Sequence, residues 1–159
     1  MKNVNYHLIV DNIRSAQNIG AIFRTADAFG CEGIILTGIS ATPPNKEILK
    51  TALGATASVK WEYHSTTEEA IEYLKSNGYK IVAVEQSDKA TLIQNYDFHK
   101  NEKQAFILGN EVEGISQQIL NLCDEIIEIP QVGIKKSINV AVAAGIIMWS
   151  CHKINLSGA

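Results

Sequence analysis

The chain has 159 residues, a length that fits one domain of ordinary size with a sizeable core. Its composition, 46% hydrophobic and 19% charged, is that of a globular protein and excludes a disordered chain. The net charge of −3 gives no overall basic signature, so charge alone argues weakly against a nucleic-acid partner, although it leaves room for a local basic patch.

Metal-site and membrane signals are missing. Cys31, Cys123 and Cys151 are far apart, and neither they nor the scattered histidines have the spacing of a zinc site, so we expect idle thiols and no metal. The N-terminus lacks a signal-peptide pattern, and the longest apolar run, 140–149, is too short to cross a bilayer. We therefore expect a soluble, cytoplasmic protein in a reducing compartment, with no membrane partner.

The first third of the chain predicts a strand, a helix and a second strand. The apolar runs HLIV, 7–10, and GIILTG, 33–38, indicate buried strands. Between them, apolar residues recur at helical spacing over 18–29, and Gly30 is placed to end that helix. Arg24, one of only two arginines in the chain, lies in the middle of this largely apolar helix.

The middle third predicts two helices separated by a strand. A short helix is expected over 44–53, opened by its proline. Residues 58–64, SVKWEYH, predict a strand. The segment 65–78 has a capping-box pattern that begins at Ser65 or at Thr66, and its Asn-Gly end is a helix stop.

The last third predicts three strands and two helices. The strands are expected over 79–85, 104–109 and 125–129, and Ser116–Leu122 are expected to form a short helix capped by its serine. Residues 139–153 form a helix that is apolar nearly all round, so it must be buried on several sides. That burial requires either a deeply packed C-terminus or a second subunit.

Strands that alternate with helices and consist of continuous apolar runs indicate an α/β fold with a mostly parallel sheet covered by helices on both faces. Such folds often bind nucleotides, but the chain has no GxG dinucleotide fingerprint, no Walker loop and no GxSxG elbow. A bound cofactor would therefore need another backbone cradle.

Two loops are candidates for that cradle. The first, LGNEVEG at 108–114, follows a predicted strand and places Glu111 at the carboxyl end of the sheet. The second, IPQVGIKKSIN at 129–139, leads into the apolar helix, which Ser137 or Asn139 can cap. Taken singly, these features are more simply explained as a turn and a helix cap, and an arginine on a helix as a surface charge.

Three segments taken together in order resemble the three motifs of the SpoU/TrmH RNA methyltransferases of the SPOUT superfamily: 12–30, 106–116 and 129–145. Residues 37–55 resemble the usual link between the first two motifs. The resemblance implies one SPOUT domain over 1–159 with a deep C-terminal trefoil knot, and no extra N-terminal RNA-binding domain of the kind that many relatives carry. It also implies a homodimer that packs the C-terminal helix across its interface.

The resemblance assigns roles to individual residues. Those expected to line a pocket for S-adenosylmethionine are Glu85, Leu108, Gly109, Ile129, Gln131, Ser137 and Ile138. Those at catalytic positions are Asn18, Arg24, Glu111, Ser137 and Asn139. Apart from the resemblance, the residues expected to contact RNA are Arg14, Arg24, Lys135 and Lys136, with Lys46 and Lys50 as further candidates; Lys135 and Lys136 adjoin the cofactor loop and are alternatively two solvated surface lysines. Gln131 and Ile138 stand where the family commonly has Met and Leu, and neither change removes a group that the reaction needs.

The implied reaction moves a methyl group from S-adenosylmethionine to a ribose 2′-hydroxyl of tRNA or rRNA. The family's proposed mechanism makes the arginine at the position of Arg24 a general base. A permanently charged guanidinium is also suited to stabilise a developing alkoxide and to clamp a phosphate. The alternative function is a catalytically inactive RNA-binding or assembly module on the same fold. A different small-molecule enzyme is disfavoured by the missing phosphate loops.

Overall fold

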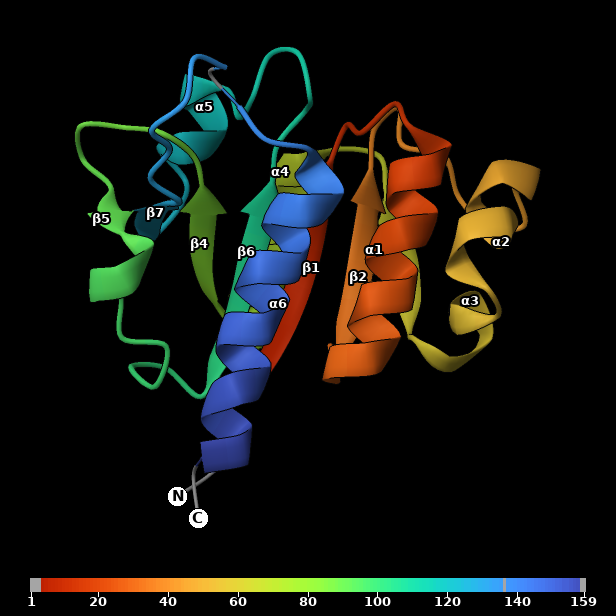
Figure 1. Ribbon diagram of the computed structural model, residues 1–159, viewed down its shortest axis with the longest axis horizontal. Helices are drawn as coiled ribbons and strands as arrows, with labels where there is room; N and C mark the ends of the chain where they lie inside the picture. The colour runs from red at the N-terminus through yellow and green to blue at the C-terminus, as the bar shows by residue number, and fades with distance from the viewer. Residues whose placement is uncertain (1–3, 136, 158–159) are drawn as a thin grey trace.

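A seven-stranded sheet forms the centre of the computed structural model, which describes residues 4–135 and 137–157 (Figure 1). The strands are β1 Asn5–Asp11, β2 Gly33–Thr37, β3 Trp61–His64, β4 Lys80–Val84, β5 Thr91–Leu92, β6 Lys103–Leu108 and β7 Glu125–Glu128. Their order is β3-β2-β1-β6-β4-β7-β5, and every pair is parallel. The predicted parallel α/β sheet is thus confirmed; the trefoil knot stays a prediction.

Helices lie on both faces of this sheet (Figure 1). They are α1 Ala16–Phe29, α2 Lys46–Ala52, α3 Ala55–Ser58, α4 Thr67–Ser76, the 3₁₀ turn η1 Ile93–Asn95, α5 Gln117–Leu120 and α6 Val140–Ser157. Helices α1 and α6 run side by side over one face of the sheet, and α4 covers the other. The short elements α3, β5 and η1 were not expected from the sequence.

Most helix ends follow the predicted signals. Gly30 adopts φ 69° and its N–H bonds the Ala26 carbonyl, which ends α1. At α4 the structure selects the second capping option, because the Thr66 hydroxyl accepts a hydrogen bond from the Glu69 N–H. The Ser116 hydroxyl caps α5 in the same way, although this helix ends at Leu120, two residues before the predicted end.

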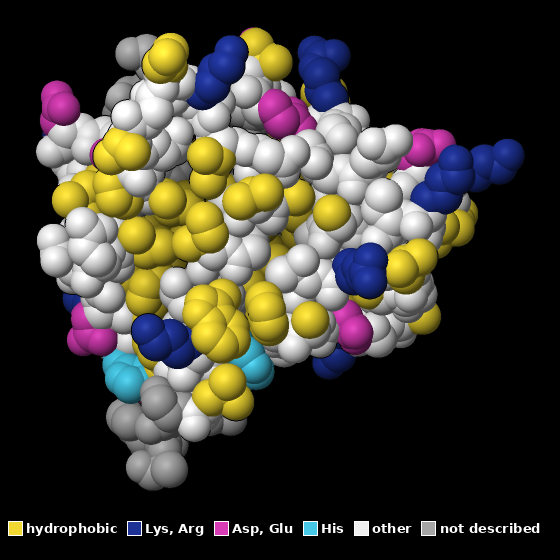
Figure 2. All heavy atoms as spheres, in the orientation of Figure 1, with side chains coloured by type: hydrophobic (Ala, Val, Ile, Leu, Met, Phe, Trp, Pro, Cys, Tyr) yellow, Lys and Arg dark blue, Asp and Glu magenta, His cyan; other side chains and the backbone are white. Residues whose placement is uncertain are grey.

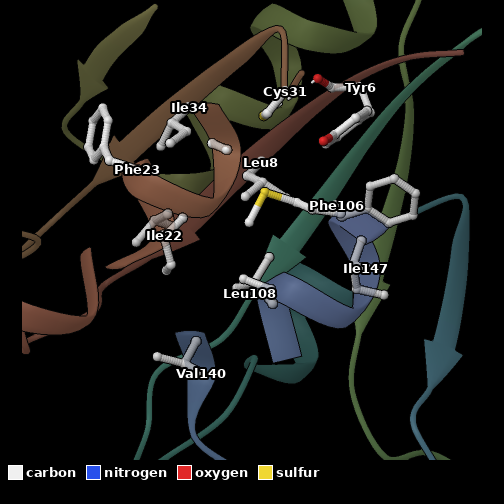
Figure 3. Packing of buried hydrophobic residues seen from close by; sticks show 14 of the residues in the cluster. Tyr6, Leu8, Ile22, Phe23, Cys31, Ile34, Phe106, Leu108, Val140 and Ile147 are labelled. Atoms are coloured by element: carbon white, nitrogen blue, oxygen red, sulfur yellow. Dashed lines mark hydrogen bonds between the residues drawn. The ribbon is translucent and has the colours of Figure 1, made fainter. Parts of the chain in front are cut away.

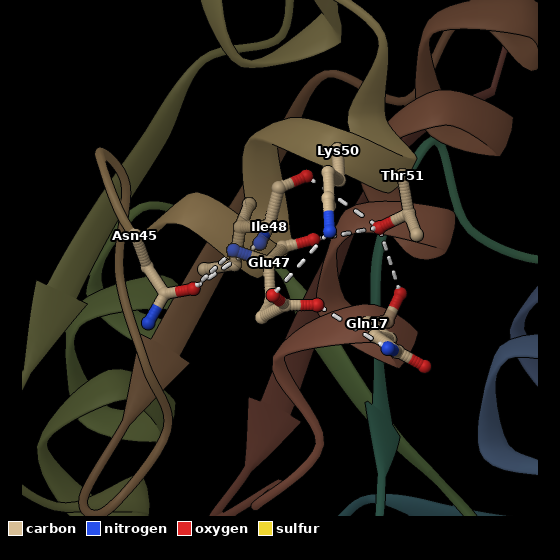
Figure 4. A network of polar contacts seen from close by, with 6 residues as sticks. All are labelled: Gln17, Asn45, Glu47, Ile48, Lys50 and Thr51. Atoms are coloured by element: carbon tan, nitrogen blue, oxygen red, sulfur yellow. Dashed lines mark hydrogen bonds and ion pairs between the residues drawn. The ribbon is translucent and has the colours of Figure 1, made fainter.

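The predicted start of α2 at Pro44 is wrong. Asn45 caps this helix instead, because its side-chain oxygen accepts hydrogen bonds from the N–H groups of Glu47 and Ile48 (Figure 4). The Thr51 hydroxyl then donates to the Gln17 carbonyl at 2.9 Å and joins α2 to α1. A side chain at Gly20 would collide with Thr51 and the Ile48 carbonyl, so glycine permits this close helix contact.

The core consists of two apolar layers, one on each face of the sheet. Leu8 of β1 lies in the layer under α1 and α6, together with Phe106 and Ile147 (Figure 3). Val10 of β1 belongs to the same layer. Ile9, between them, belongs to the layer under α4. Because successive side chains of a strand point to opposite faces, both of which are covered here, the strands are continuous apolar runs.

Helix α6 buries one side and leaves an apolar stripe on the other. Val142, Trp149 and Leu156 follow one another at seven-residue spacing and are 55%, 46% and 64% exposed. We call these three residues the α6 stripe. Figure 2 shows hydrophobic side chains gathered over the face on which α6 lies. Among the described residues no helix is long and apolar enough to cross a bilayer.

The three cysteines are free thiols that lie at least partly inside the protein. Cys31 and Cys151 are buried, and Cys123 is half-buried. Burial raises the pKa of the Cys31 thiol to about 12 and that of Cys123 to about 11, so both thiols stay protonated near neutral pH. Within residues 4–135 and 137–157, no group of three or more His, Cys, Asp or Glu side chains is placed to hold a metal ion.

Candidate functional site

The candidate site is a cavity of about 470 Å³ at the carboxyl ends of β4, β6 and β7. Three parts of the chain surround it: 84–86 at the end of β4, 108–115 at the end of β6, and residues 129, 131, 137 and 138 between β7 and α6. Ends of parallel strands that point to one edge bring loops from distant parts of the chain together there. Helix α6 closes the cavity through Val140 and Ala143.

The loop after β6 folds back tightly on itself. We call residues 109–114 the glycine loop. A Cβ at Gly109 would lie 2.7 Å from the Ile115 side chain and 2.9 Å from the Gly114 backbone carbon, so a side chain has no room here. Gly114 adopts φ 68°, a conformation that favours glycine, and its Cβ would collide with the Glu85 carboxylate.

Glu85 fastens this loop to the end of β4. One carboxylate oxygen accepts a hydrogen bond from the Ile115 N–H at 2.8 Å, and the other accepts from the Gln86 N–H at 2.9 Å. Carboxylates that accept from backbone N–H groups form stronger hydrogen bonds than neutral acceptors do. Glu85 is therefore a wall of the cavity and also the residue that fixes the exit of the glycine loop.

Asn110 orders the inside of the glycine loop, a role that the sequence reasoning missed. Its side-chain oxygen accepts from the N–H groups of Val112 and Glu113, and its backbone oxygen accepts from the Gly114 N–H at 2.8 Å. An asparagine that begins a turn by bonding the backbone two residues later is a known sequence signal, and it could have identified this residue.

Asn139 joins the site to α1. Its side-chain oxygen accepts from the N–H groups of Ala141 and Val142, which caps α6, and its side-chain nitrogen donates to the Asn18 oxygen at 3.2 Å. Of the two predicted cap residues, Asn139 is thus the one that caps. Ser137 lies beside it and lines the cavity.

All the residues expected to line a cofactor pocket border this one cavity: Glu85, Leu108, Gly109, Ile129, Gln131, Ser137 and Ile138. Glu111, expected at a catalytic position, lines the cavity as well and is exposed. The roles assigned to these residues remain predictions, but the structure brings the residues together.

Three residues expected at catalytic positions are not among those that line the cavity: Asn18, Arg24 and Asn139. Arg24 is exposed on α1 and lines a second hollow, between α1 and α2, together with Lys50 and Thr51. In Figure 1, α1 lies between α6 and α2. The hollow and the cavity share no lining residue. Within one chain, the arginine and the cavity are therefore separated.

The other cationic residues expected to contact RNA lie on the surface. Arg14, Lys46, Lys50 and Lys135 are exposed, and Lys135 belongs to the segment that leads from β7 to α6. Lys50 also lies 3.9 Å from the Glu47 carboxylate. Lys136 lies outside the described residues.

Comparisons with known proteins identify the family of this chain. The sequence model of the SpoU rRNA Methylase family matches residues 5–149. A protein of Staphylococcus haemolyticus described as a TrmH family tRNA/rRNA methyltransferase is 31% identical over 146 residues, which cover 92% of this chain and 57% of that protein. The chain thus spans little more than half the length of this curated relative.

Solved structures give the same result. The AdoMet-bound rRNA methyltransferase of Sinorhizobium meliloti is 28% identical with a TM-score of 0.89, over 98% of this chain and 59% of that one. A TrmH/SpoU tRNA modifying enzyme of A. aeolicus is 26% identical with a TM-score of 0.85, over 99% and 79%. Because the family match extends over both loops of the cavity and nearly the whole sheet, this chain belongs to the SpoU rRNA Methylase family.

Proposed function

We propose that this chain methylates a ribose 2′-hydroxyl of RNA with S-adenosylmethionine as the methyl donor. The observation that carries the proposal is the convergence of all the expected cofactor residues on one cavity, built from the second and third family motifs. The AdoMet-bound structure of the Sinorhizobium enzyme supports the choice of donor.

The cavity fits such a cofactor in its chemistry. Its walls combine apolar side chains, including Leu108, Ile129 and Ile138, with the Glu85 carboxylate and the exposed backbone of the glycine loop. Cofactor sites typically have mostly apolar walls and a few placed polar groups. Leu108, Ile129 and Ile138 are suited to hold the adenine ring, and Glu85 and the loop backbone to bind hydroxyl and amino groups.

The bound cofactor supplies a methyl group on a sulfonium, which is a good leaving group. The chain has to align the ribose oxygen with that methyl and to stabilise the charge that develops on the oxygen. We assign the second task to Arg24, because a guanidinium stays charged and can bind the adjacent phosphate through two hydrogen bonds. Asn18 and Asn139 hold α1 against the start of α6.

A homodimer would bring Arg24 to a cavity. The α6 stripe gives each copy an exposed apolar surface of the kind that is buried in an interface. Phe29 of α1 and His152 stack at 5.3 Å beside Trp149 and extend this surface towards α1. Because Arg24 lines a separate hollow and not the cavity of its own chain, we propose that it completes the cavity of the partner copy.

RNA would approach the exposed cations around this site. Lys135 lies next to the cavity-lining segment 137–138, and Arg14 precedes α1. Contacts of this kind bind phosphate and position the nucleic acid without reading its sequence. Whole-chain charge is therefore a poor guide here, since a few placed cations do the binding.

The competing proposal is an RNA-binding module without activity on the same fold. The retained pair Arg24 and Asn18 favours the enzyme. Titration calorimetry with S-adenosylmethionine separates the two, because only the enzyme requires binding of the donor.

The target can be found by mapping 2′-O-methylation in total RNA from cells with and without the gene. We expect a site in tRNA or rRNA to lose its methyl group when the gene is absent; tRNA is the first to examine, since the A. aeolicus neighbour is a tRNA modifying enzyme. Unchanged maps, with the protein present in the control cells, would contradict the proposal.

A further inference from the structure

Asn110 bonds across the structure to a segment 98 positions earlier in the chain. Its side-chain nitrogen donates to the Asn12 backbone carbonyl at 2.6 Å. Its side-chain oxygen meanwhile accepts from Val112 and Glu113 at 2.9 and 3.1 Å. Because backbone N–H groups only donate, the oxygen must face them and the nitrogen must face Asn12. The orientation of this carboxamide is therefore fixed by its partners.

Asn12 lies in the turn that leads from β1 into α1. It adopts φ 53°, and its side chain accepts from the Ile39 N–H and donates to the Asp11 carboxylate, each at 3.0 Å. The Ile13 N–H donates to the Ser40 hydroxyl at 2.9 Å. The loop after β2 thus holds this turn from one side, and Asn110 holds it from the other.

The turn fixes where α1 begins. Ser15 caps the helix by accepting from the Asn18 N–H at 3.1 Å, and Arg24 follows along the same helix. Within the described residues, hydrogen bonds tie this start to the surroundings of the cavity twice, through Asn110 to Asn12 and through Asn139 to Asn18.

We propose that Asn110 is a positioning residue that holds the start of α1 against the glycine loop. One half of its side chain shapes the loop, and the other half sets the place of the helix that carries Asn18 and Arg24. This inference rests on the proposed function for its effect on catalysis. Displacements of about 1 Å in the placement of catalytic groups are known to cost about 100-fold in rate.

The substitution Asn110→Asp separates the two halves. A carboxylate still accepts from Val112 and Glu113, so the loop is retained, but it has no N–H for the Asn12 carbonyl and repels it. We expect kcat at saturating donor to fall about tenfold or more, and the Kd for S-adenosylmethionine from calorimetry to change by less than about threefold. Amide hydrogen exchange over 12–18 should become about tenfold faster in the free protein.

Asn121→Asp is the matched control, because Asn121 is an exposed asparagine that accepts from Gln117 at the end of α5. It introduces the same charge away from the contact between Asn110 and Asn12. It should therefore leave kcat, the Kd for S-adenosylmethionine and the hydrogen exchange over 12–18 unchanged. Unchanged hydrogen exchange over 12–18 in Asn110→Asp would overturn the proposal. An equal loss of donor affinity and kcat would also overturn it, because Asn110 would then only shape the cavity. Exchange needs no RNA, so wild-type protein that methylates no RNA would contradict only the proposed function.

Discussion

At the scale of single residues, the chain relies on a few side chains whose chemical type cannot be exchanged. Arg24 is exposed and lies on the surface of α1, where a lysine would serve as well for solubility. Its proposed role requires a planar group with several fixed donors, which lysine lacks. Activity and stability should therefore respond differently to substitution at this position.

We expect Arg24→Lys to lower kcat about 100-fold, the size of loss seen when one donor to a developing oxyanion is removed. The melting temperature should stay that of the wild type, because the side chain is exposed. The conservative change Arg14→Lys, at the other arginine, serves as the control. Near-normal turnover of Arg24→Lys on the RNA substrate would refute the proposed role of the guanidinium in stabilising the oxygen and binding the phosphate.

Gly109 is constrained by space. In Gly109→Ala the new methyl group would meet Ile115 and the Gly114 backbone, so the glycine loop must shift. We expect a destabilisation of about 1–3 kcal/mol, typical of overpacking, together with weaker donor binding by calorimetry. Gly133→Ala is the control in the other cavity loop, since its Cβ would meet no atom within 4 Å. If Gly109→Ala changed stability and donor affinity no more than Gly133→Ala does, Gly109 would be replaceable.

At the scale of elements, the sequence predicted those whose signals are local. The strands other than β5 and helices α1, α4 and α6 follow from apolar runs, periodicity and caps. The start of α2 was missed because Asn45 competes with Pro44 as the first residue, and the proline lies outside the helix. Strand β5 has only two residues, and its pairing with β7 comes from tertiary contacts that a local pattern does not contain.

The candidate site likewise has parts that the sequence predicts and parts that depend on tertiary contacts. The cavity residues were identified by resemblance to long motifs, and the structure brings them together. The bond of Asn110 to Asn12 spans 98 positions, so no short pattern could reveal it. The separation of Arg24 from the cavity likewise depends on how α1, α2 and α6 pack, which no residue spacing specifies.

The cap of α6 allows a prediction at this scale. Asn139→Ala removes the acceptor for Ala141 and Val142, and should lower the free energy of unfolding by about 1 kcal/mol in urea. Asn139→Asp keeps an acceptor beside the positive end of the helix and should retain that stability, while it loses the donor to Asn18. Equal destabilisation by both substitutions would place the stabilising contact at Asn18 instead of the cap.

At the scale of the whole molecule, the role that we propose for Arg24 requires two copies of the chain. The α6 stripe runs the length of the helix, and Arg24 lies away from the cavity of its own chain. A C₂ dimer places each surface against the same surface of its partner, so one contact would complete two sites.

Mixed dimers test this arrangement. Arg24→Lys and Gly109→Ala proteins should each be nearly inactive alone, and should regain about a quarter of the wild-type rate when unfolded and refolded together. Half of the random dimers are then mixed, and each mixed dimer has one site with an intact arginine and an intact cavity. Native mass spectrometry verifies that they form. Mixed dimers without activity would show that Arg24 serves its own chain.

The identity of the methylated nucleoside is the decisive test of the proposed ribose 2′-O-methylation. Purified protein is incubated with labelled S-adenosylmethionine and with tRNA or rRNA from cells that lack the gene, and the RNA is digested to nucleosides for mass spectrometry. We expect label in a 2′-O-methylnucleoside with the wild-type protein and only a trace with Arg24→Lys. Label on a base, or no label in either RNA while the donor binds, would contradict it.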